Sequence, residues 1–164
     1  MKITSLISTH FALSVVLSLG IAVAPVWAGE HDHHHMEELE LQFNNGQKWE
    51  TDASLRQAMG LVGQSLNKVL GDIHHHKLNA AGYEALATEV NKQVVYMIEN
   101  CELEPTADEQ LHIVIARMMV SAQGMEQSSD INEKRQAAVQ LMGALNSYAT
   151  YFNDEDFVKP KHNQ

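Results

Sequence analysis

The chain has 164 residues, a length typical of one domain, and its 11 Lys+Arg against 21 Asp+Glu give a formal net charge of −10 at pH 7. So acidic a protein repels nucleic acid and anionic lipid, which argues against both as partners, and it raises the local concentration of cations. A single cysteine, Cys101, excludes an internal disulfide, and its spacing from Met97 predicts burial on the apolar face of a helix.

Residues 1–28 have the pattern of a cleaved secretion signal. Lys2 is followed by an apolar segment, residues 11–24, and then by small residues up to Ala28. The apolar segment is shorter than the roughly 20 residues that a membrane-spanning helix needs. We therefore expect cleavage between Ala28 and Gly29, with a mature protein that is periplasmic or secreted and has no stable membrane insertion.

Residues 29–50 are predicted to form a His-rich extended arm. Polar and apolar residues alternate over residues 38–43, as in a strand, and residues 44–46 (NNG) are a turn signal. No second strand follows, so we expect the arm to pack on the rest of the protein through its apolar side chains. These side chains are Leu39, Leu41, Phe43 and Trp49.

Apolar residues then recur at helical spacing in four segments between residues 51 and 153. The first helix is expected from about residue 52 to residue 70, with Gly71 as the glycine just past its end. The second is expected to begin near Asn79 and to end before Pro105.

The third helix is predicted to begin at a capping box formed by Thr106 and Glu109. The fourth follows a break at residues 127–130, and residues 154–164 are predicted to be a loose tail. Four amphipathic segments with short links predict an all-α fold, an antiparallel up-down-up-down four-helix bundle preceded by the extended N-terminal arm.

Histidines at the expected new N-terminus form the first candidate metal site. After cleavage, His31 is the third residue of the chain. The amine of Gly29, the amides of Glu30 and His31, and the His31 imidazole then supply four nitrogens in a square plane, a geometry that Cu(II) and Ni(II) accept. Further donors are supplied by His33, His34, His35 and Met36, and His34 or His35 also suits Zn(II) or Cu(I).

A second run, His74, His75 and His76, is predicted to lie in the first interhelical loop. Two of these imidazoles can meet one ion. Because the arm is long, the two clusters make either one joint site or two independent sites. The alternative is an exposed turn whose histidines have no role.

His112 lies beside the apolar seam of the third helix and is predicted to be a hydrogen-bonded core residue. With Glu109 it makes one Glu-x-x-His motif, but a di-iron bundle needs two. Methionines at seam positions are predicted to fill the core. No nucleophile, base and orienting group occur as a set, so we expect no enzyme.

Residues 49–59 (WETDASLRQAM) and the helical segments after them resemble the small soluble periplasmic cytochrome b, a four-helix haem bundle. Met59 falls about where that family has its first-helix haem methionine. The family's second axial ligand is a histidine late in the last helix, whereas residues 145–152 (LNSYATYF) contain none. The resemblance therefore implies the architecture and the compartment, but not the haem. Residues 44–49 (NNGQKW) and 100–105 (NCELEP) resemble stretches of small uncharacterised exported proteins, which implies no activity.

The leading hypothesis is a periplasmic protein that buffers or carries copper, with Ni(II) or Zn(II) as substitutes and another periplasmic metal protein as partner. The second hypothesis is a helical interaction or adaptor module with incidental histidines. The third is a haem-binding, cytochrome-like bundle, which the missing axial histidine disfavours.

Overall fold

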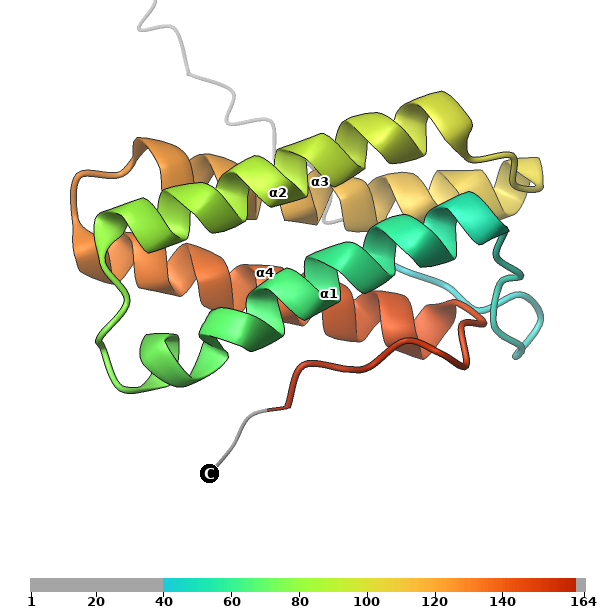
Figure 1. The fold of residues 1–164 in the computed structure, drawn as a ribbon. Helices are drawn as coiled ribbons and strands as arrows, with labels where there is room; N and C mark the ends of the chain where they lie inside the picture. The colour runs from blue at the N-terminus through green and yellow to red at the C-terminus, as the bar shows by residue number, and fades with distance from the viewer. Residues whose placement is uncertain (1–39, 162–164) are drawn as a thin grey trace, which may run out of the picture. The chain divides into compact units, whose positions relative to one another are not determined.

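A computed structural model describes residues 40–161 of the protein, and in this part the chain forms four helices that pack side by side (Figure 1). Successive helices run in opposite directions, and each contacts its neighbours in the chain, while α1 also contacts α4. The helices are α1 (Ala53–His74), α2 (Ala80–Asn100), α3 (Pro105–Gln127) and α4 (Ile131–Tyr151). The all-α four-helix bundle that the sequence predicts is confirmed.

The four apolar seams meet in one core. On α1, for example, Leu55, Met59, Val62 and Leu66 are all fully buried. These residues step by three and four, so that they lie on one face of the helix, and burying that face supplies most of the stability of an amphipathic helix. The spacing of apolar residues therefore predicted correctly which side of each helix faces the core.

Side-chain caps start three of the four helices. Asp52 Oδ1 accepts a hydrogen bond from the Leu55 amide at 2.6 Å, and the N-caps Asn79 and Asp130 accept similar bonds. The other carboxylate oxygen, Asp52 Oδ2, accepts a bond from the amide of Glu102 at 2.7 Å. One aspartate thus satisfies an open amide of α1 and also holds the α2–α3 loop against the start of that helix.

Helix α3 begins differently from the prediction. Its N-cap is Glu104, which makes no side-chain capping bond, and Pro105 is the first helical residue. Proline suits this position because its fixed φ is helical and its missing N–H has no partner there in any case. The predicted capping box is therefore wrong, since Thr106 already lies inside the helix and cannot cap it.

Helix α1 continues one turn beyond its predicted end. Gly71 lies within the helix, and the residue with left-handed backbone just past the end is His76, with φ 56°. The extra turn buries Ile73, which continues the apolar seam and explains why the helix does not stop at the glycine. The prediction that Gly71 ends the helix is wrong.

Two glycines give a direct test of this packing. A Cβ on Gly124 of α3 would lie 2.8 Å from the Cβ of Ala137 on α4, whereas a Cβ on Gly71 would have no neighbour within 4 Å. Gly124→Ala is expected to lower the free energy of unfolding by about 1–3 kcal/mol through overpacking. Gly71→Ala is expected to raise it by about 0.5–1 kcal/mol, because alanine favours a helix interior. Urea unfolding measures both, and stabilisation by both variants would contradict the close approach of α3 and α4.

The described part of the arm is held against α4. The Trp49 amide donates to Tyr151 O at 2.8 Å, the Asn153 amide donates to Trp49 O at 2.7 Å, and Trp49 Nε1 donates to Gln42 O at 2.7 Å. Trp49 is buried, and Phe43 packs on the Tyr151 ring although it remains 45% exposed.

Leu41 is buried as expected, and Leu39 lies outside the described residues. The predicted turn is present, with left-handed backbone at Asn45 and Gly46. Both residue types tolerate that conformation, which accounts for the turn at this point of the arm.

The segment after α4 is not loose as far as Pro160. The Phe157 ring meets the Tyr148 ring edge-on, with 5.1 Å between centroids, and lies close above Gly63 of α1. Pro160 is also buried. An aromatic side chain that contacts both α1 and α4 is enough to fix the chain here, so the prediction of a loose tail is wrong for this stretch.

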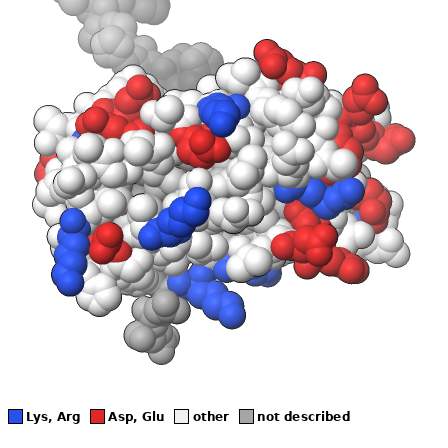
Figure 2. Space-filling model, viewed as in Figure 1, with Lys and Arg blue, Asp and Glu red and all other residues white. Residues whose placement is uncertain are grey.

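The surface is charged and mixed. Figure 2 shows acidic side chains gathered near the end of the bundle that carries the α2–α3 loop, with basic side chains scattered over the same face. Within residues 40–161, no helix is both long and apolar enough to span a membrane.

Candidate metal centre

The predicted N-terminal ligands, Gly29, Glu30, His31, His33, His34 and His35, lie outside the described residues. The second predicted cluster, His74 to His76, lies at the end of α1. Of the two predicted clusters, the structure therefore describes only the second.

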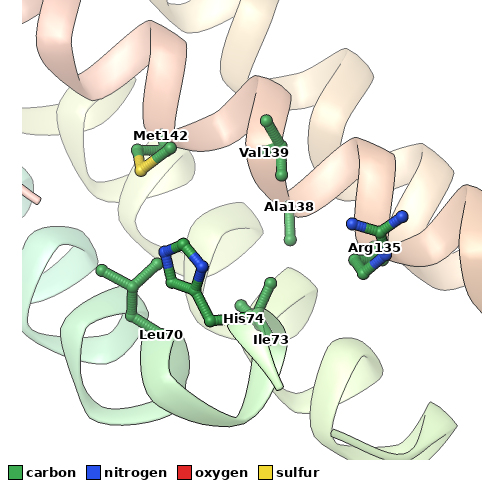
Figure 3. Close-up of a pocket in the computed structure, with 7 residues that line it drawn as sticks. All are labelled: Leu70, Ile73, His74, Arg135, Ala138, Val139 and Met142. Atoms are coloured by element: carbon green, nitrogen blue, oxygen red, sulfur yellow. The ribbon is translucent and has the colours of Figure 1, made fainter. Parts of the chain in front are cut away.

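The three histidines of the second cluster have different settings. His74 is the last residue of α1 and is half-buried, His75 is the C-cap and is exposed, and His76 is exposed in the left-handed position. The prediction that all three lie in a loop is therefore wrong for His74, because the additional turn of α1 includes it. Helical placement turns its side chain toward α4 (Figure 3).

His75 has one nitrogen fixed by the backbone. Its Nδ1 lies 2.7 Å from the Gly71 carbonyl oxygen. A carbonyl only accepts hydrogen bonds, so Nδ1 carries the hydrogen, and the neutral ring has its lone pair on Nε2. Metal-binding histidines are commonly held in this way, with one ring nitrogen donating to a backbone carbonyl while the other binds the ion.

His74 lines a small pocket between α1 and α4. The pocket has a volume of about 60 Å³ and is lined by Leu70, Ile73, His74, Arg135, Ala138, Val139 and Met142. In Figure 3, the His74 ring and the Met142 thioether lie toward one end of the pocket, and the Arg135 guanidinium lies toward the other. The Arg135 Nε is buried and has no hydrogen-bond partner.

Among residues 40–161, no group of three or more His, Cys, Asp or Glu side chains is arranged to hold a metal ion. His74, His75 and His76 therefore do not converge with one another or with nearby carboxylates into such a group. A site built on them needs either a different kind of ligand or ligands from another segment.

His112 is exposed, not a core residue. Its Nδ1 lies 2.9 Å from Asp108 O and 3.4 Å from Asp108 Oδ2, one turn earlier on α3, and its side chain is 64% exposed. The core prediction is wrong because the position falls just outside the buried face that Leu111 and Ile115 define. Glu109 is also exposed.

Cys101 follows α2 as its C-cap and is half-buried, less than the sequence predicts. Burial, and then the nearby carboxylates of Asp52 and Asp108, raise the pKa of its thiol from 9.0 to about 12. The thiol is therefore protonated at neutral pH, which makes it a poor nucleophile and a poor metal ligand.

This raised pKa has two measurable consequences. At pH 8 the native Cys101 thiol is expected to react with iodoacetamide at least about 100-fold more slowly than the thiol of urea-unfolded protein, because much less thiolate is present. The folded pKa exceeds the unfolded value, so the neutral thiol stabilises the fold fully below about pH 9, and this stabilisation is lost as the pH rises from 9 toward 12. Since the chain has one cysteine, its alkylation is read without interference. Equal rates in the two states would contradict the assignment.

Most seam methionines fill the core as predicted. Met59, Met97, Met118 and Met125 are almost completely buried, whereas Met119 is 50% exposed. Met142 is also buried, but unlike the other core methionines it lines the pocket beside His74. Sequence spacing did not reveal this pair, which comes from two helices that meet only in the fold.

No protein-family model, no curated protein and no solved structure matches the chain.

Proposed function

We propose that this protein binds a transition metal in the periplasm or outside the cell, and that it buffers or carries copper without being an enzyme. Ni(II) and Zn(II) are the substitutes that the same ligands accept. The proposed ligands are Gly29, Glu30, His31, His33, His34, His35, His74, His75 and His76. The observation that supports the proposal most strongly is the hydrogen bond between His75 Nδ1 and Gly71 O. This bond fixes the ring and puts its lone pair on Nε2, the nitrogen that would bind the metal.

Titration of the mature protein with Cu(II) tests the proposal. We expect a visible absorption band from the N-terminal chelate, lost in a variant with His31, His33, His34 and His35 all changed to Gln. Changing His74, His75 and His76 together to Gln is expected to remove a second, weaker binding event. His112→Gln is the matched control, because His112 is exposed and hydrogen-bonded to a backbone carbonyl but lies outside both clusters. No band in the intact protein, or equal binding by all variants, would reject the proposal.

Binding is also expected to depend on pH. Imidazole ligates only when neutral and has an ordinary pKa of about 6.5, so affinity should fall as the pH is lowered through this region. Binding that is constant from pH 7.5 to 5 would point to ligands other than histidine.

A second candidate function is a helical interaction module. Four large apolar side chains are half or more exposed on α2 and α3: Val95, Ile98, Met119 and Val120. A partner that covered these side chains would remove apolar surface from water. A partner retained equally with and without a chelator, and lost on Ile98→Gln, would favour this function.

A further inference from the structure

The pocket between α1 and α4 combines two metal-binding side chains that are far apart in sequence. His74 supplies an imidazole from the last turn of α1, and Met142 supplies a thioether from α4 (Figure 3). A water-sized guest needs about 10–15 Å³, so a pocket of about 60 Å³ holds an ion but not an organic cofactor.

The donor pair selects for a soft cation. Thioethers bind Cu(I) in preference to hard ions, and imidazole binds copper well. Cu(I) also accepts low coordination numbers, which a pair of ligands can satisfy. We propose that His74 and Met142 bind monovalent copper, Cu(I), in the pocket between α1 and α4. This inference rests on the proposed copper function and deepens it, because it names the oxidation state of the ion that His74 binds in the pocket.

The remaining walls of the pocket favour a singly charged ion. None of the seven lining residues is acidic. Apart from His74, Met142 and Arg135, all of them are apolar, among them Leu70, Ile73 and Val139. Arg135 places a positive charge at the other end of the pocket, where it repels a divalent cation more strongly than a monovalent one. A pocket without a carboxylate does not compensate the charge of Cu(II).

The length of α1 is what creates this arrangement. Had the helix ended at Gly71, His74 would lie in the loop with His75 and His76. Because it continues, His74 falls on the same face as Leu70 and Ile73 and faces the pocket, whereas the two following histidines are exposed. The run of three histidines is thereby divided into one pocket ligand and two surface ligands.

The experiment isolates the pocket in the otherwise intact mature chain. The N-terminal donors are removed by H31Q, H33Q, H34Q, H35Q and M36L, and this background is titrated with Cu(I) under anaerobic conditions against bicinchoninate. One Cu(I) per chain is expected. Met142→Leu, which conserves volume, should weaken binding at least about tenfold, because even outer ligands of a metal commonly contribute that much. His74→Gln should do the same.

Met119→Leu is the matched control, since Met119 is exposed on α3 and does not line the pocket. Copper X-ray absorption should show a sulfur neighbour in the background protein and in the M119L variant, but not in the M142L variant. Unchanged affinity, or a retained sulfur signal, in M142L would overturn the assignment. If the background binds no Cu(I) while the unmodified protein binds Cu(II), the inference fails and the proposed function stands. If the unmodified protein binds neither ion, both fail.

Discussion

Replacing Lys134 with methionine is expected to lower the free energy of unfolding by about 2–3 kcal/mol. Lys134 is only 3% exposed, and its Nζ donates to Met125 O at 2.6 Å and to Glu126 O at 3.2 Å. These carbonyls belong to the last turn of α3, where helical partners are missing. Methionine fills a similar volume but donates no hydrogen bond, so the cost is that of leaving the carbonyls without this donor and without a cation at the helix C-terminus.

Two further variants separate this effect from a simple ion pair. Lys134 Nζ also lies 3.1 Å from Glu84 Oε1, but the Glu84 side chain is 52% exposed, so Glu84→Gln is expected to change stability by less than about 1 kcal/mol. Lys92→Met is the matched control, since Lys92 is 71% exposed and lies 4.0 Å from Glu89, and it should shift stability by no more than about 0.5 kcal/mol. Urea unfolding followed by circular dichroism measures all three. A loss for K134M no larger than that for K92M would show that the carbonyls find other donors.

Lys134 also shows how far sequence reasoning reaches in the fold. The apolar seams predicted the four helices and their inner faces, because burial of a helical stripe depends on spacing alone. Lys134 sits on the seam that Ala138 and Leu141 continue, and a lysine at such a position was the available signal of a buried cation. Its partners are carbonyls at the end of another helix, which no spacing within α4 identifies.

The helix ends were predicted less well than the helices. A glycine such as Gly71 often ends a helix, but α1 continues past it because the next turn buries Ile73. Thr106 and Glu109 have the spacing of a capping box, but α3 already begins at Pro105. In both places burial or fixed backbone geometry outweighed the local signal.

The candidate site was predictable only in part. The run of three histidines was evident, but its division between a pocket and the surface follows from the length of α1. Met142 becomes a candidate ligand only because α1 and α4 bring it to the same pocket as His74. Long-range pairings of this kind depend on the packing of helices and leave no local pattern in the chain.

Trp49→Ala is expected to cost about 3–5 kcal/mol, the largest loss among the substitutions considered. The indole is 8% exposed and is part of the hydrophobic core, although it comes from the arm and not from a helix. Trp49→Phe keeps a ring in place and loses the Nε1 bond to Gln42 O, so it should cost about 1–2 kcal/mol.

Phe43→Ala is the control for removing an aromatic ring from the same arm. Phe43 is 45% exposed, so its loss should cost less than about 1 kcal/mol. Urea unfolding followed by circular dichroism ranks the three variants, and W49A no worse than F43A would show that the arm is dispensable for folding. A larger loss of stability for W49A than for F43A would instead show that the arm unfolds cooperatively with the four helices.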